Sequence, residues 1–367
     1  MSPLAKKSAL ITGFPGFLAH RLLLELATEG DAPIYVLSLP DTLVAARREI
    51  NELEKKAPRL EGRVKLVSGD ITRKRLGMDP RLYEELLKEV GVVWHLAALY
   101  DLAVEAQIAY RVNLGGTYEV LDFCEKCTGL ERFNHISTCY VSGTRRGKIL
   151  ESELDCGQDH HNHYEATKFW SEVEVQRRMK DLPTTVLRPG IVVGDSQTGT
   201  TAKYDGPYFI FQLLHRLPKW LPFPNIGRGD TVVNLVPVDF VAQSMSYLGL
   251  HGDATGKVLH LAAPHPMTAK QIVDAVLRHF EHDPARGQIP ASWVERALEN
   301  QLIQEWTGIP PEALAYFNHD AHYDTTEASA LLSQGGISCP HLSTYLPTLL
   351  DTFLRFPDGP PPLSKTV

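Results

Sequence analysis

The stretch that decides the fold reads Ala9-Leu10-Ile11-Thr12-Gly13-Phe14-Pro15-Gly16-Phe17-Leu18-Ala19. Ala9 to Thr12 predicts a buried strand, and Leu18 to Thr28 predicts a helix. Glycines between two such elements let the backbone turn tightly and approach a pyrophosphate at the helix N-terminus. Ala19 stands where a third glycine often falls. A tight connection alone would also use glycines, but at the first strand of a doubly wound sheet we expect dinucleotide binding.

The opening half of the chain repeats the alternation of apolar strands with helical segments. Further strands are predicted at Ile34–Leu39, Val64–Ser68, Val92–Leu96, Phe133–Ser137 and Thr184–Leu187, with a helix at Leu82–Glu89. Their nearly continuous apolar character is typical of a parallel sheet covered by helices on both faces. We therefore predict an α/β fold, a doubly wound parallel (Rossmann) sheet with a smaller, mainly helical C-terminal substrate lobe.

A change of composition after Pro189 marks the expected lobe. Residues 194–229 are rich in Gly, Pro and aromatics, apolar order resumes near Thr231, and a mostly helical end follows. We predict that residues 1–198 and 231–264 form the dinucleotide-binding domain and that residues 199–230 and 265–356 form the lobe. The tail, residues 357–367, is expected to be disordered.

Composition limits the class of protein. The 367 residues are 43% hydrophobic and 22% charged, and no apolar run of about eighteen residues offers a membrane span. The net charge of -7 with dispersed Lys and Arg gives no reason to expect nucleic acid. Five cysteines, including Cys124 and Cys127 in a C-x-x-C, make neither a disulfide framework nor a complete zinc site. The expected location is the cytoplasm.

Three features at later strand ends are candidates for cofactor contacts. Gly69-Asp70-Ile71 follows the third strand, where the Asp70 carboxylate could accept from an adenine amino group or cap the next helix. His95-Leu96-Ala97-Ala98 ends the fourth strand in small residues, which lets backbone pass close to the ribose and nicotinamide. Asn113 falls within a predicted helix, Ile108–Cys124, where asparagine is mildly unfavourable and invites a functional explanation.

The densest chemical pattern comes next. The fifth strand ends in His135-Ile136-Ser137-Thr138, and Tyr164 and Lys168 follow at a spacing of four. On a helix these two side chains lie on one face. A neighbouring ammonium would favour the ionised phenol and lower its pKa from about 10, which makes Tyr164 a candidate proton donor.

From the glycine turn to residue 265, the sequence resembles the extended short-chain dehydrogenase/reductase superfamily. The resemblance implies that Thr138 polarises a carbonyl, Tyr164 is the acid/base, and Lys168 is its electrostatic partner and a ribose ligand. It implies that Asn113 holds a proton-relay water. Ser137 is a rival for the hydroxyl role, but Thr138 keeps the family's spacing to the following Val-Ser-Gly.

A further motif narrows the resemblance. Leu187-Arg188-Pro189-Gly190-Ile191-Val192-Val193-Gly194 and the following Asp-Ser-Gln-Thr-Gly look like the male-sterility-type branch, which holds fatty acyl-CoA reductases and carrier-protein thioester reductases. The cofactor-binding residues expected from the turn, the strand ends and this motif are Thr12, Gly13, Phe14, Pro15, Gly16, Phe17, Leu18, Ser38, Asp70, Ile71, Leu96, Ala97, Ala98, Ser137, Lys168, Pro189, Gly190, Ile191 and Val192.

The choice of nicotinamide is open at the end of the second strand. Thioester reductases of this branch commonly carry an arginine there, whereas this chain reads Leu37-Ser38-Leu39-Pro40-Asp41. Asp41 is slightly late for the acid that binds the ribose of NAD, while Arg47 or Arg48 could reach a 2′-phosphate. We expect NADP(H) or NAD(H), with the balance toward NADPH.

Two remaining segments have simple interpretations. The adjacent histidines His160, His161 and His163 have no second ligand set, so no metal is expected. The aromatic stretch Tyr204–Phe223 is expected to pack within the lobe beside the active site.

The leading functional hypothesis is NAD(P)H-dependent reduction of a carbonyl on a mostly apolar substrate, either a ketone or an acyl thioester that gives an aldehyde or alcohol. The substrate would be a small molecule or would arrive on a carrier protein in trans. Two alternatives remain: a nucleotide-sugar epimerase or dehydratase that recycles NAD, and a non-catalytic NAD(P)-sensing regulator. The oligomeric state is open.

Overall fold

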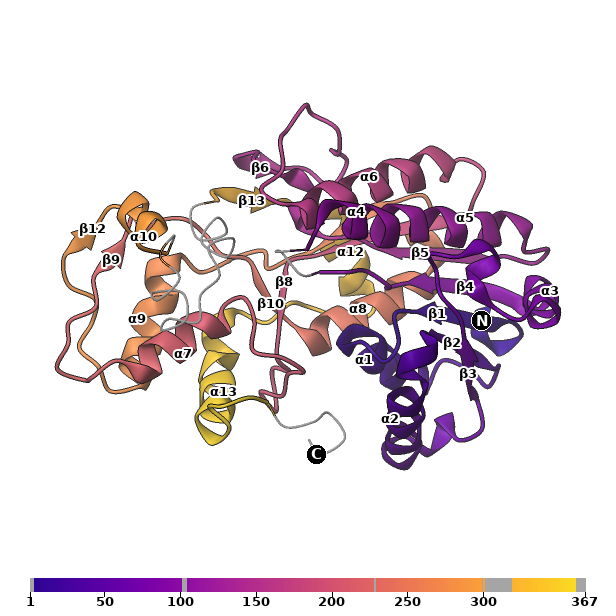
Figure 1. Cartoon of the computed structure of the whole chain (residues 1–367), viewed down its shortest axis with the longest axis horizontal. Coiled ribbons are helices and arrows are strands. Elements are labelled where there is room, and N and C mark those ends of the chain that lie inside the picture. The colour runs from indigo at the N-terminus through magenta and orange to yellow at the C-terminus, as the bar shows by residue number, and fades with distance from the viewer. Residues whose placement is uncertain (1–2, 101–103, 228, 299, 301–318, 361–367) are drawn as a thin grey trace.

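The computed structural model describes residues 3–100, 104–227, 229–298, 300 and 319–360. Its centre is a seven-stranded sheet in the order β3-β2-β1-β4-β5-β7-β11, with all neighbours parallel (Figure 1). The strands are β1 (Ser8–Thr12), β2 (Ile34–Ser38), β3 (Val64–Ser68), β4 (Val90–His95), β5 (Arg132–Ile136), β7 (Thr184–Pro189) and β11 (Val258–Leu261). The order reverses between β1 and β4, which opens a crevice at their carboxyl ends. The doubly wound sheet is confirmed.

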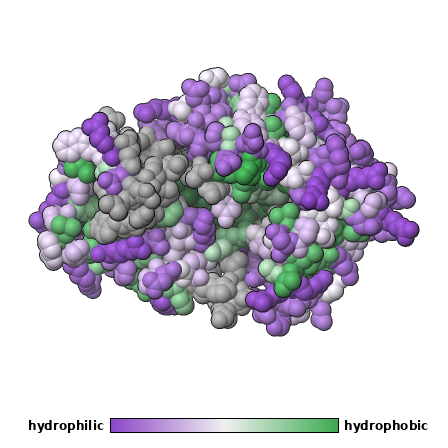
Figure 2. Space-filling view, in the orientation of Figure 1, coloured by the Kyte–Doolittle hydropathy of each residue, from purple (hydrophilic) through white to green (hydrophobic). Residues whose placement is uncertain are grey.

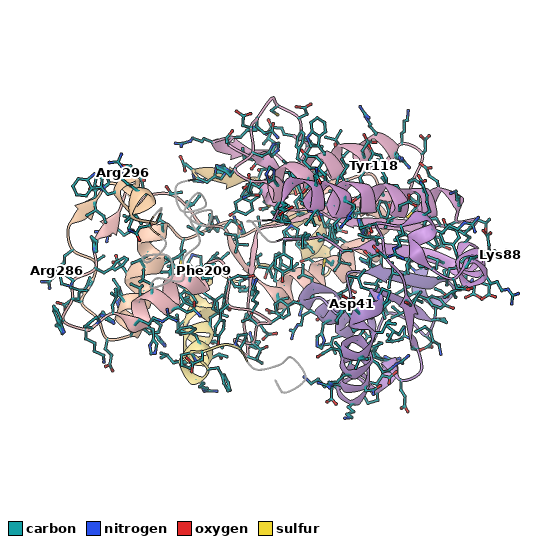
Figure 3. The ribbon with its side chains drawn as sticks, in the orientation of Figure 1. Asp41, Lys88, Tyr118, Phe209, Arg286 and Arg296 are labelled. Carbon is teal, nitrogen blue, oxygen red and sulfur yellow. The ribbon has the colours of Figure 1, made fainter. Side chains whose placement is uncertain are left out.

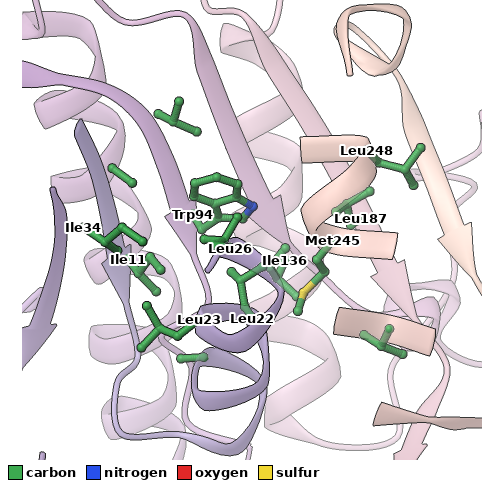
Figure 4. Close-up of a cluster of buried hydrophobic side chains, with 14 of the residues drawn as sticks. Ile11, Leu22, Leu23, Leu26, Ile34, Trp94, Ile136, Leu187, Met245 and Leu248 are labelled. Carbon is green, nitrogen blue, oxygen red and sulfur yellow. The ribbon is translucent and has the colours of Figure 1, made fainter. Parts of the chain in front are cut away.

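Helices cover both faces of the sheet. On one face lie α1 (Phe17–Leu26), α2 (Leu43–Lys56), α8 (Val238–Leu250) and α12 (Thr326–Gln334). On the other lie α3 (Pro80–Glu89), α5 (Gly116–Lys126) and α6 (His163–Arg178). Alternate side chains of each strand enter the two cores, so Leu10 faces α5 whereas Ile11 faces α1. Figure 4 shows the α1 side, where Trp94 and Ile136 of the sheet meet Leu22 and Met245.

A second hydrophobic core lies in the lobe. It is built by α7 (Tyr208–Arg216), α9 (Ala269–His279) and α13 (Leu342–Arg355), which bury Phe211, Val276 and Leu349 completely. Figure 1 shows these helices beyond the sheet's edge, away from α3. Other elements in the described residues include α4 (Ala106–Ala109), α10 (Ala291–Leu298) and three parallel pairs: β6 (Gly147–Ile149) with β13 (Ala321–Tyr323), β8 (Ile191–Val193) with β10 (Leu235–Pro237), and β9 (Asn225–Ile226) with β12 (Gln288–Ile289).

The α12 helix differs from the expected domain division. It falls within the range assigned to the lobe, 265–356, but Ala328 and Leu332 pack into the same core as α1 and α8. The buried Glu151 carboxylate fixes it there, because it accepts from His260 N at 2.9 Å on β11, and from Glu327 N at 2.7 Å and Ala328 N at 3.1 Å at the start of α12. No local sequence pattern predicts such a long-range cap.

The tail, residues 357–367, was expected to be disordered. Its residues 361–367 lie outside the described residues. Among the helices described, none combines the length and apolar character needed to cross a bilayer.

Candidate active site

The glycine turn lies at the carboxyl end of β1. Gly13 has a φ of 88°, in the left-handed region that only glycine adopts freely. A Cβ there would lie 2.7 Å from Ala97 N, and one at Gly16 would lie 2.6 Å from Gly13 O. Gly16 also precedes α1, whose first backbone N–H groups face the turn. This backbone cradle fits a pyrophosphate.

Replacing Gly13 by alanine is therefore expected to weaken nicotinamide binding by more than about tenfold, because about 1.4 kcal/mol of lost binding free energy already has that effect. Gly62→Ala is the matched control, since Gly62 has a φ of 70° but nothing within 4 Å of its added Cβ. Fluorescence titration with NADPH and NADH measures both variants. Equal affinities for the two variants would contradict the assignment of the turn.

A buried chain of hydrogen bonds holds the turn to β4. Thr12 Oγ1 lies 2.8 Å from His95 Nδ1 and accepts from Ala97 N at 3.1 Å. His95 Nε2 lies 3.1 Å from Thr117 Oγ1 on α5. Burial lowers the pKa of His95 to about 3, so the ring is neutral and acts as a connector.

Tyr164 and Lys168 lie near the start of α6. The Asn162 side chain accepts from Glu165 N at 3.0 Å and caps the helix, which sets where Tyr164 falls. Lys168 Nζ donates to Ile136 O at 2.7 Å, at the end of β5. Tyr164 forms a hydrogen bond with Thr138. The structure thus brings these three predicted residues together.

The pKa values correct one expectation. Burial raises the pKa of Tyr164 to about 12, although the Thr138 hydrogen bond opposes the change. The expected lowering by Lys168 is wrong for this structure, because burial is the largest influence on the pKa of the phenol, while the ammonium donates to the Ile136 carbonyl. Burial also lowers the pKa of Lys168 to about 8, against the attraction of Glu172. Tyr164 is therefore a protonated donor at neutral pH.

The two rival hydroxyls have different partners. Ser137 Oγ donates to the buried carboxylate of Glu172 at 2.5 Å. Thr138 Oγ1 accepts from Tyr140 N at 3.3 Å, lies at the long distance of 3.5 Å from the neutral acceptor Pro189 O, and contacts the Tyr164 phenol. Because the Ser137 proton is committed to a charged acceptor, Thr138 is the better candidate to polarise a carbonyl.

Asn113 lies in a π-helical turn, Tyr110–Gly115, between α4 and α5. Its amide donates to Leu99 O at 3.0 Å and Thr167 Oγ1 at 2.9 Å, and it accepts from Leu99 N at 2.7 Å. The side chain therefore ties the segment after β4 to α6. Its expected role as the holder of a relay water stays a prediction.

A cavity of about 470 Å³ opens where the sheet's crevice meets the lobe. Figure 2 shows hydrophobic residues in the hollow between the two parts, on a face that is otherwise mostly hydrophilic. The predicted residues that line this cavity are Gly13, Gly16, Phe17, Leu18, Leu96, Ala98, Ser137, Thr138, Tyr164, Lys168, Pro189, Gly190, Ile191 and Val192.

The other predicted residues are not part of the cavity wall: Thr12, Phe14, Pro15, Ser38, Asp70, Ile71, Ala97 and Asn113. Several of them support it. Ser38 Oγ donates to Phe14 O at 2.9 Å and so anchors the glycine turn. Ile71 belongs to the core against α5. Asp70 Oδ1 accepts from Thr72 N at 2.9 Å within the turn after β3, and it does not cap the next helical segment, Lys74–Gly77, whose N-cap residue is Arg73.

Sequence reasoning missed part of the wall. The residues not singled out are Tyr100, Ile136, Tyr140, Thr201, Ala202, Lys203, Val233 and Leu235. Asp205, Gly206 and Pro207 lie within the stretch Tyr204–Phe223, which was expected beside the active site. Phe209 fell within the aromatic stretch and lies on α7, on the side of the lobe toward the sheet domain (Figure 3). The aromatic stretch is the only signal that could have found the lobe residues.

The cavity lining includes neither the charged residues after β2 nor the histidines His160, His161 and His163. After β2, Asp41, Arg47 and Arg48 are all exposed, and Asp41 is labelled in Figure 3. In the histidine loop, His161 Nδ1 lies 2.9 Å from Glu165 Oε2, and this hydrogen bond raises the pKa of His161. Among the described residues, no three His, Cys, Asp or Glu side chains gather as a metal site.

Comparisons with known proteins give consistent results. An NAD-binding family model described as male sterility protein matches residues 11–245. The chain is 24% identical over 368 residues to a linear gramicidin synthase of Brevibacillus parabrevis, across 95% of this chain and 7% of that protein. It is 26% identical to a putative fatty acyl-CoA reductase of Drosophila melanogaster, across 67% and 52%. A probable fatty acyl-CoA reductase 5 of Arabidopsis thaliana is 23% identical, across 78% and 72%. The chain thus spans a small part of the first of these relatives and about half of the second.

Solved structures share the fold. The terminal R domain from the myxalamid PKS-NRPS biosynthetic pathway aligns with a TM-score of 0.82 and 24% identity, over 96% of this chain and 91% of that one. A UDP-glucuronic acid 4-epimerase from Bacillus cereus aligns with a TM-score of 0.64 and 21% identity, over 95% and 99%. Both likenesses concern the fold alone.

Proposed function

The chain belongs to the male sterility protein family, and on that basis we propose that it is a nicotinamide-dependent reductase of the extended short-chain dehydrogenase/reductase type. We propose as substrate an acyl thioester, carried by coenzyme A or by a carrier protein, with a ketone as the second carbonyl class. Relatives named as fatty acyl-CoA reductases support this class.

The apolar lining of the cavity is the observation that carries the proposal. The same cavity that contains Tyr164, Thr138 and the glycine turn continues into a wall with many apolar residues, among them Phe209 and Pro207 of the lobe and Leu235 of β10. Among its described lining residues, Lys168, Lys203 and Asp205 are the charged ones. An apolar acyl group fits such a wall better than a nucleotide-sugar, whose diphosphate needs several donors.

The residues divide the chemistry between them. A bound reduced nicotinamide would supply the hydride, and Gly13, Gly16 and Lys168 are the residues proposed to hold it. Thr138 and Tyr164 donate hydrogen bonds to the carbonyl oxygen and stabilise the charge that develops there. Tyr164 gives its proton to that oxygen. With a thioester this gives a hemithioacetal, whose carbon–sulfur bond then breaks; the hydroxyl proton leaves the oxygen, the departing sulfur takes up a proton, and an aldehyde and a thiol are released.

Thr138→Ala is expected to lower kcat by about 10²-fold, because it removes one donor to the developing oxyanion. Ser137→Ala, which removes the neighbouring hydroxyl and its hydrogen bond to Glu172 but no donor to the oxyanion, is expected to have a smaller effect. Steady-state kinetics of the two variants compare the residues directly. The opposite ranking would assign the carbonyl contact to Ser137.

A screen of nicotinamide oxidation tests the function. Acyl-CoAs, acyl carrier proteins, aldehydes and ketones are each supplied with NADPH and with NADH. We expect at least one thioester to cause oxidation of the nicotinamide. The KM for NADPH should be lower than that for NADH, because we propose that the exposed Arg47 or Arg48 lies near the 2′-phosphate.

Two other outcomes would replace the proposal. Purification with tightly held NAD and conversion of a nucleotide-sugar would indicate an epimerase or dehydratase. Binding of nicotinamide with no turnover of any carbonyl would indicate a sensor.

All five cysteines are free thiols, which supports our proposal of a reducing, cytoplasmic location.

A further inference from the structure

A fully buried ion pair lies directly behind the candidate active site. Glu172 of α6 and Arg188 of β7 are 0% and 1% exposed, and Arg188 Nη2 lies 2.6 Å from Glu172 Oε1. Arg188 Nε donates to both carboxylate oxygens, at 3.0 and 3.1 Å. Ser137 Oγ donates to Oε2 at 2.5 Å, and Gln176 Nε2 donates to Oε1 at 2.8 Å. The carboxylate thus joins α6 to the ends of β5 and β7.

The partners of Glu172 on β5 and β7 are next to residues of the proposed mechanism. Ser137 precedes Thr138, and Arg188 precedes Pro189 of the cavity wall. Glu172 itself is one helical turn after Lys168, because four residues is the spacing of helix neighbours. A shift of α6 relative to β5 would therefore move Lys168, and Tyr164 with it, away from Thr138.

The surroundings of Lys168 make the charge of Glu172 significant. His95 on β4 and His135 on β5 face the ammonium, and burial lowers the pKa of both rings below their usual range. Among the described residues, the attraction that raises the pKa of Lys168 comes from Glu172, and burial opposes it. Despite its own burial, Arg188 and the hydrogen bonds keep the pKa of Glu172 below its usual value.

The groups behind Arg188 complete the electrostatic picture. His260 Nε2 on β11 lies 3.1 Å from Arg188 Nη1, and the pKa of His260 is lowered to about 4 by burial. Arg188 Nη1 also donates to Glu151 O at 3.3 Å. Cys139 beside β7 has its pKa raised by burial. His260 and Cys139 are therefore neutral at pH 7, and the acidic and basic groups of this network are the Glu172–Arg188 pair and the Glu151 carboxyl, whose pKa is raised by burial.

We propose that Glu172, which touches neither substrate nor cofactor, is a positioning residue that clamps α6 onto β5 and β7 and keeps Lys168 in its ammonium form. The role of Lys168 rests on the proposed function, whereas the clamp itself is a property of the fold. Because a misplacement of about 1 Å can cost about 10²-fold in rate, the effect on turnover is expected to be large.

The variant Glu172→Gln keeps the size of the side chain and removes its charge. We expect kcat to fall by roughly 10- to 100-fold. We also expect the pH at which NADPH binding and kcat/KM decline to move down by about one unit, because an opposite charge near the ammonium is lost. Glu174→Gln is the matched control on the same helix, since Glu174 is partly buried and pairs with the exposed Arg177, away from Arg188 and Ser137. It should leave both pH profiles unchanged.

A second variant covers the case in which an unpaired Arg188 prevents folding. Glu172→Leu combined with Arg188→Met removes both charges, a change that buried pairs often tolerate, and it should move the pH profile of NADPH binding in the same direction. NADPH binding is measured without turnover. If the wild-type protein binds NADPH but reduces no carbonyl substrate, the proposed function is refuted, whereas the role of Glu172 is not. Folded variants that keep the wild-type pH profile refute the role of Glu172. A wild-type chain that binds no nicotinamide overturns both.

Discussion

Tyr164→Phe is expected to lower turnover by about 10³-fold, within the range that a positioned general acid contributes. The substitution removes the phenolic proton and the hydrogen bond to Thr138, but leaves the ring in the cavity. The dissociation constant for NADPH should change little, because the glycine turn and Lys168 are untouched. Single-turnover kinetics together with fluorescence titration separate the two effects.

Tyr140→Phe is the control for this prediction. Tyr140 also lines the cavity, and burial raises its pKa strongly. The Tyr140 phenol is not assigned a proton-transfer role, so turnover should stay within about tenfold of wild type. A large loss in Tyr140→Phe with a small loss in Tyr164→Phe would exchange the roles of the two tyrosines.

The fold could be predicted closely because its signals are local. The strand Val64–Ser68 is marked by three apolar residues, Val64, Leu66 and Val67, and its observed bounds agree with the expected ones. Gly13 is readable because a left-handed turn between strand and helix needs glycine. The small pairs β6–β13 and β9–β12 were not predicted, because two- or three-residue strands joined across more than sixty residues leave no periodic pattern.

The candidate site was readable only in part for the same reason. Thr138, Tyr164 and Lys168 stand in a recognisable order along the chain, and the structure places all three at one cavity. Lys203 and Leu235 also line it, but nothing in their neighbourhood marks them in the sequence. The extent to which Tyr164 is buried could not be predicted from the sequence either. The predicted direction of its pKa change was wrong for that reason.

The alkaline limit of activity is expected to come from Lys168. Tyr164, with a pKa of about 12, stays protonated throughout the accessible range, whereas the pKa of Lys168 is about 8. As pH rises through about 8, the ammonium loses its charge and both kcat/KM and NADPH binding should decline. A pH–rate profile of the wild-type enzyme measures this limit. If activity stays constant at pH values well above the pKa of Lys168, the lysine has no part in the mechanism.

Lys168→Met tests the same residue through stability. The pKa of Lys168 falls from 10.5 in a free side chain to about 8 in the fold, so the folded state disfavours the charge. The resulting loss of stability begins as pH falls below about 10.5 and is complete below about 8, where it amounts to roughly 3 kcal/mol.

Removing the ammonium should relieve most of that cost at neutral pH, although the Ile136 carbonyl then loses its donor. A net stability at or above that of wild type is therefore expected, with turnover lowered by about 10²-fold or more. Thermal unfolding at pH 7 and at pH 10 measures the first effect, and the difference between variant and wild type should shrink at the higher pH. A variant that is both less stable and less active would instead make Lys168 a structural residue. When a group serves chemistry at the expense of stability, its removal lowers activity but leaves stability unchanged or raises it.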